Sequence, residues 1–148
     1  MPDKRLTLFF QLFNEIGILS QLSRSMLESR LGNGMLLPHF TVLNHLMRVG
    51  EGTTPLALSS AFQIPKASMT HTLAGLVKAG YIEMRENVKD KRSKCIYITK
   101  TGRAFRNNAI QSLAPDVDEI AEEFSLDEVE AMLPALEELR RILDRRRD

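Results

Sequence analysis

The fold is decided by one stretch, residues 64–102, which reads IPKASMTHTLAGLVKAGYIEMRENVKDKRSKCIYITKTG. Its beginning predicts a short helix, because Met69, Leu73 and Leu76 recur at the spacing of one helical face. If that face is buried, the opposite face is small, polar or basic and carries no carboxylate. Such a face can lie against base edges and phosphates without bulk or repulsion. From this helix we expect DNA contacts by Lys66, Ser68, Thr70, His71 and Lys78.

Two runs of alternating apolar and polar residues follow, and each predicts a half-buried strand. The first run covers residues 82–85 and the second residues 95–99, with a highly charged segment between them. Asp90 precedes Arg92 by two residues, so its carboxylate can hold the guanidinium in one pose. A positioned arginine on an exposed tip is what minor-groove readout requires. The residues expected to contact DNA from this tip are Lys89, Asp90, Lys91, Arg92 and Lys94.

This succession of helix, charged ribbon and second helix resembles the MarR family of bacterial winged-helix transcription regulators. The flanking helices also fall where that family has them, so the resemblance extends over nearly the whole chain. Two positions depart from the family pattern. His71 stands where the family often has Arg, and Gly75 where it commonly has Arg preceded by Asp. The matching residues are Leu73, Leu76, Gly80 and Ile82, then Asp90-x-Arg92, then Ile96-x-Ile98-Thr99-x-x-Gly102.

The resemblance implies a homodimeric repressor that binds a pseudo-palindromic operator in double-stranded DNA. It also implies a small aromatic or hydrophobic effector, bound between the dimerisation helices and the DNA-binding region, and it implies no cofactor. Plain hydrophobic core is the alternative interpretation of the residues that would line the effector pocket. Those residues are Phe9, Phe13, Ile16, Phe40 and Leu43.

Helices are expected on both sides of the quoted stretch, so the predicted fold class is mainly α with a small β-ribbon, or α+β. Thr99 and Ser125 are expected to cap helices, and Pro115 to kink a long helix that precedes Ser125. The first helix and the C-terminal helices carry more apolar surface than a small winged-helix core could cover, which favours pairing of two chains. We expect a dimerisation helix at 1–36, a winged helix-turn-helix DNA-binding domain at 37–101 and C-terminal dimerisation helices at 102–148.

The charge distribution separates the chain into a basic and an acidic part, although the formal net charge is only +1. Residues 66–106 hold ten basic and three acidic side chains, whereas residues 113–139 hold ten acidic and no basic ones. We assign the basic part to DNA. A single cysteine favours a reducing compartment, and no apolar run reaches 18 residues. These features predict a cytoplasmic protein that is not inserted in a membrane.

Enzyme motifs are missing from the sequence: it contains no P-loop, no G-x-S-x-G and no dinucleotide-binding fingerprint. His39 and His45 are six residues apart on one predicted helix and do not share a face, so no metal site is predicted. Cys95 is interpreted as structural, with a redox switch as the alternative. The competing functional hypothesis is a winged-helix module that contacts only proteins, since its acidic C-terminal helices would suit a basic partner.

Overall fold

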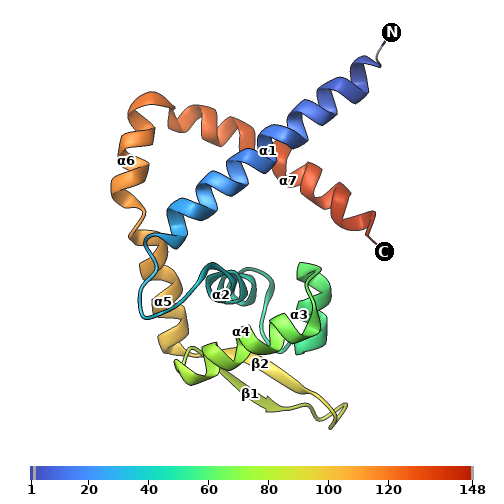
Figure 1. The fold of residues 1–148 in the computed structure, drawn as a ribbon, viewed down its shortest axis with the longest axis vertical. Helices are drawn as coiled ribbons and strands as arrows, with labels where there is room; N and C mark the ends of the chain where they lie inside the picture. The colour runs from blue at the N-terminus through green and yellow to red at the C-terminus, as the bar shows by residue number, and fades with distance from the viewer. Residues whose placement is uncertain (2, 148) are drawn as a thin grey trace. The chain divides into compact units, whose positions relative to one another are not determined.

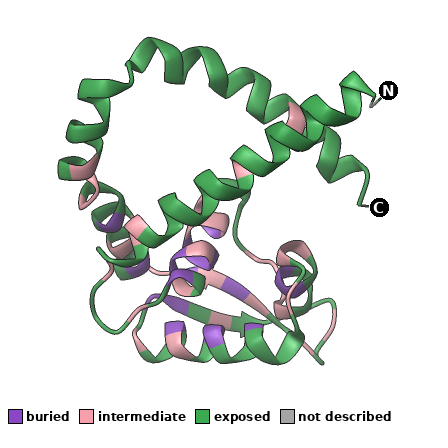
Figure 2. Cartoon of the chain, turned by 45° about the horizontal axis from the view of Figure 1, so that its top comes forward, coloured by how far each residue is buried: buried purple, intermediate pink, exposed green. Residues whose placement is uncertain are grey.

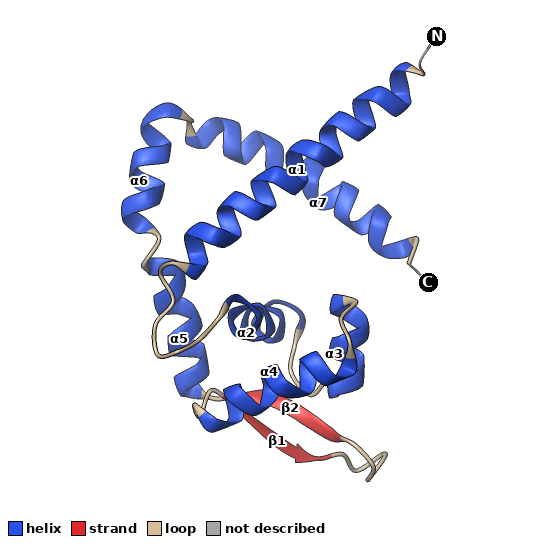
Figure 3. Ribbon diagram, viewed as in Figure 1, coloured by secondary structure: helices blue, strands red, loops and turns tan. Residues whose placement is uncertain are grey.

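The computed structural model describes Met1 and residues 3–147, and the chain forms two compact units, Met1–Ser112 and Leu113–Asp148. The fold is mainly helical with one two-stranded antiparallel sheet, which confirms the predicted fold class (Figure 3). The smaller unit contains α6 (Ala114–Glu123) and α7 (Leu126–Arg145) (Figure 1). The larger unit contains α1 (Lys4–Glu28), α2 (Leu37–Val49), α3 (Pro55–Phe62), α4 (Lys66–Lys78), β1 (Ile82–Glu86), β2 (Lys94–Ile98) and α5 (Lys100–Gln111).

The core of the larger unit lies among α2, α3, α4 and the ribbon. The three residues predicted to face inward from α4 are buried, with Met69 1%, Leu73 2% and Leu76 0% exposed. They pack with apolar residues of α2 and both strands, including Leu43 and Ile96. Figure 2 shows the same concentration of buried positions in α2, α4 and the ribbon, whereas α1 is exposed along nearly its whole length. This core presents the opposite face of α4 to solvent.

The connection between α2 and α3 pairs with the ribbon as a third, short extended segment. Within the ribbon, Ile82 pairs with Ile98 and Met84 with Ile96 in antiparallel register. Thr53 forms an isolated bridge to Ile96 on the other side: the Ile96 N–H donates to the Thr53 carbonyl at 2.8 Å. The Ile96 carbonyl also accepts the Gly52 N–H at 2.8 Å, so both backbone groups of Ile96 bond to this connection, while β2 pairs with β1 along its other edge. The Ile96 side chain is fully buried, which fixes the base of the ribbon against the core.

The junction between α4, the ribbon and α5 depends on one glycine. A Cβ built on Gly102 would lie 2.1 Å from the Tyr81 carbonyl oxygen and 3.0 Å from Ile98 Cγ1, so only glycine fits there. Thr99 caps α5 as predicted, because its hydroxyl accepts the Gly102 N–H at 3.0 Å. The Tyr81 ring stacks on Phe105 of α5 at 4.6 Å between centroids. These contacts tie the end of α4 to α5.

The prediction of one long, kinked helix before Ser125 was wrong. The chain forms two helices there. α5 ends at Gln111 and α6 begins at Ala114, with Pro115 in the first turn of α6. The proline ring would clash with the carbonyl of the residue four positions earlier, which is Gln111. Helix α5 ends at that residue, and Pro115 is accommodated in the first turn of α6, where its missing N–H breaks no helical hydrogen bond.

The smaller unit begins its last helix as predicted. The Ser125 hydroxyl accepts the Glu128 N–H at 3.2 Å and donates to the Glu128 carboxylate at 3.4 Å. Pro134 lies inside α7, and the helix continues past it to Arg145. None of the described residues of α6 or α7 is buried. Among the residues that the model describes, no helix combines the length and the apolar character needed to cross a membrane.

Candidate nucleic-acid interface

The outer face of α4 is the first component of the candidate interface. Lys66, Ser68, Thr70, His71 and Lys78 are all exposed there, as the helical periodicity predicted. No acidic residue occurs between Lys66 and Lys78, so the whole helix is free of negative side chains. The Thr70 hydroxyl donates its proton to the Lys66 carbonyl at 3.0 Å, which leaves its oxygen as an acceptor. The face therefore offers cations and hydroxyls to a ligand that carries negative charge.

The tip of the ribbon is the second component, and it is ordered by its own side chains. Asn87 accepts the Lys89 N–H at 3.0 Å and donates to the Ser93 hydroxyl at 3.2 Å. The Asp90 N–H donates to the Asn87 carbonyl, and the Ser93 N–H donates to the Asp90 carbonyl, both at 3.2 Å. Two consecutive turns thus close the tip, which stands at the free end of the ribbon in Figure 1.

Asp90 holds Arg92 with three hydrogen bonds. The Arg92 backbone N–H and Nε both donate to Oδ1 at 3.0 Å, and Nη2 donates to Oδ2 at 3.2 Å. The hydrogen bonds from Arg92 lower the pKa of the Asp90 carboxyl group, so it stays ionised at neutral pH. The Arg92 side chain is nevertheless 92% exposed. Its guanidinium is therefore held in one orientation and fully available to a ligand.

The other cations of the tip surround Arg92 without being buried. Lys89, Lys91 and Lys94 are exposed. Farther down the ribbon, the Arg85 guanidinium lies 4.0 Å from the centre of the Tyr97 ring and pairs with Glu83. Arg85 is thereby occupied by the ribbon itself, and the cations that extend outward are those at the tip.

A groove beside α4 was not predicted from the sequence. It has a volume of about 630 Å³ and separates α4 from the beginning of α2 and the preceding loop. A Cβ built on Gly75 would lie 2.9 Å from His39 Nε2, so the imidazole of α2 occupies space that a larger residue at position 75 would take. This contact is a physical reason for glycine at Gly75. Residues that line the groove are Asn33, Gly34, Met35, His39, His71, Ala74, Gly75, Lys78 and Ala79.

The residues predicted to line an effector pocket occupy two different environments. Phe9 and Phe13 are exposed on α1 with their ring centroids 6.0 Å apart, and Ile16 is half-buried. Phe40 and Leu43 are buried in α2, Leu43 as part of the core. The structure therefore places the first three on the helix that would pair with a second chain and the last two inside the winged-helix domain.

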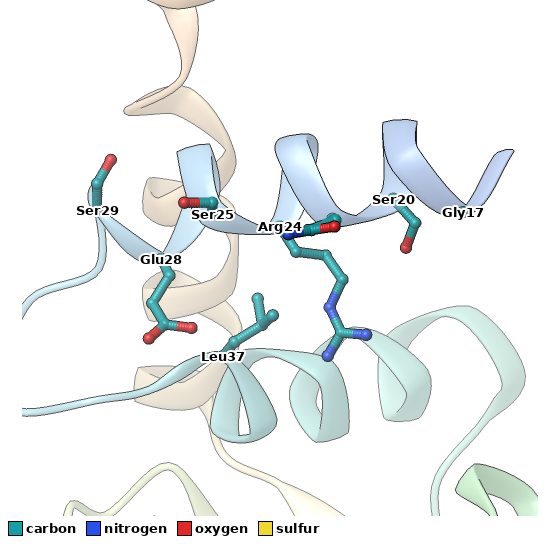
Figure 4. A pocket seen from close by; sticks show the side chains of 8 residues that line it. Gly17, Ser20, Arg24, Ser25, Glu28, Ser29 and Leu37 are labelled. Atoms are coloured by element: carbon teal, nitrogen blue, oxygen red, sulfur yellow. The ribbon is translucent and has the colours of Figure 1, made fainter. Parts of the chain in front are cut away.

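Two hollows in the larger unit are lined by Arg24 of α1, and none of the five predicted residues lines either of them. The larger has a volume of about 790 Å³ between α1 and the start of α2, and Figure 4 shows Arg24 and Glu28 extending from α1 toward α2. The smaller, about 230 Å³, is mostly apolar. Its lining consists of Arg24, Pro38, Val42, Phe62, Ile64, Met69 and Thr72.

The predictions on metals and on Cys95 concern the rest of the larger unit. In the part of the chain that the model describes, no three His, Cys, Asp or Glu side chains gather so as to hold a metal ion. His45 packs edge-on against Phe62, with the ring centroids 5.0 Å apart, and burial lowers its pKa. Cys95 is a half-buried free thiol in β2, opposite Arg85.

Comparisons with known proteins agree with this geometry. Residues 33–93, which contain α2 through the wing tip, match the model of the MarR family. The HTH-type transcriptional repressor YetL of Bacillus subtilis is 25% identical over 135 residues, which cover 90% of this chain and 79% of that protein. The transcriptional regulator BldR from Sulfolobus solfataricus has a similar fold, with a TM-score of 0.72, 23% identity, and coverage of 97% of this chain and 99% of BldR.

A mutant of MarR from E. coli, crystallised with operator DNA, also has this fold. Its TM-score is 0.67 at 23% identity, with coverage of 93% of this chain and 99% of that protein. The family match covers α2, α3, α4, β1 and the wing tip up to Ser93, and β2 lies outside it. Family proteins are transcription regulators and not enzymes, in agreement with the missing catalytic motifs. Over residues 33–93 the chain is similar to the MarR family of winged helix-turn-helix transcription regulators, and its fold is that of the solved MarR structures.

Proposed function

We propose that this chain is a repressor that binds a pseudo-palindromic operator in double-stranded DNA as a homodimer. One observation carries the proposal: the larger unit combines a carboxylate-free helix face with an exposed arginine held in place by Asp90. A carboxylate-free helix fits the major groove, and an oriented arginine fits a narrow minor groove. Figure 1 shows α4 and the ribbon side by side in this unit, so both can reach one duplex.

The residues proposed to contact DNA fall into two groups. From α4, the polar side chains would read base edges and the lysines would bind phosphates. From the wing tip, Arg92 would enter the minor groove, Asp90 would orient it, and the lysines would bind the flanking backbone. Exposure of every one of these side chains except Asp90, which is half-buried, supports the assignment. The residues are Lys66, Ser68, Thr70, His71 and Lys78 from α4, and Lys89, Asp90, Lys91, Arg92 and Lys94 from the wing.

The proposed homodimer follows from exposed apolar side chains in each unit. In the larger unit, α1 is 25 residues long and contains no buried residue. Even its aromatic side chains Phe9 and Phe10 are 51% and 68% exposed. In the smaller unit, apolar residues recur along α7, among them Val129, Met132 and Leu136. Monomeric proteins rarely expose this much apolar surface. We assign residues 1–36 and 102–148 to dimerisation and residues 37–101 to DNA binding.

A symmetric dimer sets the form of the operator. Two copies of α4 would enter successive major grooves about 34–36 Å apart, so the two half-sites would be related by a two-fold axis. The relatives support this proposal: YetL is a repressor by name, and MarR has been crystallised with operator DNA. Repression would result from occupancy of the operator by the dimer.

We also propose that a small aromatic or hydrophobic effector changes DNA affinity. Such a ligand would favour one dimer geometry and so alter the distance between the two copies of α4. Phe9, Phe13, Ile16, Phe40 and Leu43 remain the residues proposed for the pocket. The mostly apolar hollow of about 230 Å³ supports an apolar ligand, because Arg24 lines it and can pair with a carboxylate, although none of those five residues lines it.

The proposed function is tested by hydroxyl-radical footprinting on the DNA upstream of the protein's own coding sequence. The expected result is a two-fold symmetric footprint whose two protected segments are one helical turn apart, with further protection outside them from the wings. Uniform cleavage at protein concentrations that retard the DNA would contradict sequence-specific binding. A single unpaired footprint would contradict the dimer.

A further inference from the structure

The groove between α2 and α4 contains a hydrogen-bond donor for which no acceptor is found among the described residues. The Leu36 N–H donates to His39 Nδ1 at 2.8 Å, so Nδ1 is an acceptor and the proton of the neutral ring lies on Nε2. No hydrogen bond of Nε2 is found among the described residues, and none of their buried side-chain nitrogen or oxygen atoms lacks a partner. The Nε2–H of the half-buried His39 is therefore open to solvent in the groove.

Two cationic or polar groups of α4 flank this donor. His71 and Lys78 line the groove together with His39, and the loop side contributes Asn33, Gly34 and Met35, which carry no charge. Asn33 is already engaged, since its amide donates to the Tyr81 hydroxyl at 3.0 Å. No carboxylate lines the groove. An anion that entered it would meet Lys78 and two imidazoles and no negative side chain.

We propose that this groove receives a backbone phosphate of the bound DNA, and that neutral His39 donates its Nε2–H to that phosphate. The inference rests on the proposed function. It adds to the interface a residue from α2, outside both the recognition helix and the wing. Gly75 leaves the space for the imidazole, because a Cβ at this position would lie 2.9 Å from His39 Nε2. The donor to this phosphate thus comes from α2, the helix next to α4.

The neutral form of His39 is the form that fits the geometry. Protonation of Nδ1 would replace the acceptor of the Leu36 N–H by a second donor, which would break that hydrogen bond. Burial also lowers the pKa of His39, and the nearby His71 lowers it further. The charged and titratable groups that line the groove around the ring are His71 and Lys78 on α4, and the loop residues that line it, Asn33, Gly34 and Met35, carry no charge. At a pH above 6.5, the ordinary pKa of histidine, His39 is therefore expected to bind the phosphate in its neutral form.

The test is fluorescence anisotropy of an upstream duplex with wild type, His39→Gln and His39→Asn. A glutamine amide can reach the position of Nε2, whereas an asparagine amide reaches only that of Nδ1. We expect His39→Gln to bind like wild type, and His39→Asn to lose about fivefold per protomer, or about 25-fold for a dimer. His45→Asn, on the same helix but outside the groove, is the matched control and should stay within about twofold of wild type.

The salt dependence identifies what His39 contributes. Removal of a neutral donor releases no counterion, so His39→Asn should leave the slope of log affinity against log salt unchanged, whereas Lys78→Ala should reduce it by about 0.9 per phosphate. A reduced slope for His39→Asn would overturn the proposal that His39 acts as a neutral donor. Wild-type affinity for His39→Asn would overturn the phosphate contact and leave the proposed function intact. If the wild type showed no salt-sensitive binding to DNA, both the phosphate contact and the proposed function would be overturned.

A second variant keeps the test valid if His39→Asn does not fold. Gly75→Ala places a Cβ 2.9 Å from Nε2 and must displace the imidazole, while alanine favours the helix. We expect thermal stability to stay the same or rise while DNA affinity falls. In a double-mutant cycle, Gly75→Ala should have little further effect in the His39→Asn background. Additive losses would mean that alanine disturbs DNA directly, and would overturn the proposal that Gly75 acts through His39.

Discussion

Replacement of Arg92 by alanine should weaken DNA binding without weakening the fold. The Arg92 side chain is 92% exposed and is bonded only to Asp90, two residues away, so the core loses no contact. Exposed ion pairs contribute little to stability, and we expect no measurable change in the thermal midpoint. In the proposed complex, each wing would lose one charged hydrogen-bonded contact. The expected loss is about fivefold per wing, or about 25-fold for a dimer.

The assay is fluorescence anisotropy at several salt concentrations, with Lys91→Ala as the matched control. Both side chains are exposed cations at the wing tip, but only Arg92 is oriented by a carboxylate. Each substitution should reduce the salt slope by about 0.9 per protomer. Only Arg92→Ala should also reduce the preference for the operator over an unrelated duplex, because minor-groove readout depends on DNA shape. Equal losses of preference in the two variants would refute the assignment of Arg92 as the minor-groove residue.

Three further predictions concern stability and assembly. Gly102→Ala places a Cβ 2.1 Å from the Tyr81 carbonyl and should cost on the order of 3 kcal/mol in urea unfolding. Gly17→Ala, with no atom within 4 Å, should change stability by less than about 1 kcal/mol, and similar losses would show that the junction is not tight. Phe10→Glu should convert the dimer to a monomer in sedimentation equilibrium, and an unchanged mass would exclude this face of α1. Burial and the charge of Arg48 lower the pKa of His45, so the fold should lose stability as the pH falls below 6.5. His45→Gln should lessen that loss in thermal melts, and an equal loss would assign it to other groups.

Features that depend on neighbours in the chain were predicted well from the sequence. The buried face of α4 follows from the spacing of Met69, Leu73 and Leu76, and all three are buried. The cap at Thr99 and the ion pair of Asp90 with Arg92 join residues two or three positions apart. In each case the partners are brought together by local backbone geometry, so the sequence alone contains the required information.

Features that depend on packing between distant segments were not predicted. The contact of His39 with Gly75 joins residues on different helices, and Gly75 alone indicated only a missing side chain. The bridge of Thr53 to Ile96 adds a third extended segment that has no strand pattern of its own. Pro115 marks the division into α5 and α6, but a proline alone does not predict such a division, because Pro134 lies inside α7 and that helix continues past it. Interhelical contacts have no comparable local signal.

The alternative of a module that binds only proteins is not favoured by these findings. The family match covers the helix-turn-helix and the first half of the wing, and a MarR protein with this fold has been crystallised with operator DNA. The acidic side chains that suggested a basic partner lie in α6 and α7, which belong to the smaller unit. The basic side chains of α4 and the wing tip lie in the larger unit and form the surface proposed for DNA.

The most direct test of the central claim is fluorescence anisotropy with a duplex from the protein's own upstream region and an unrelated duplex of equal length. Both are titrated across a range of salt concentrations. The proposed function predicts tight binding to the upstream duplex, at least about a thousandfold preference over the unrelated one, and affinity that falls steeply with salt. Equal, weak binding to both duplexes, or no binding at low salt, would contradict a sequence-specific regulator.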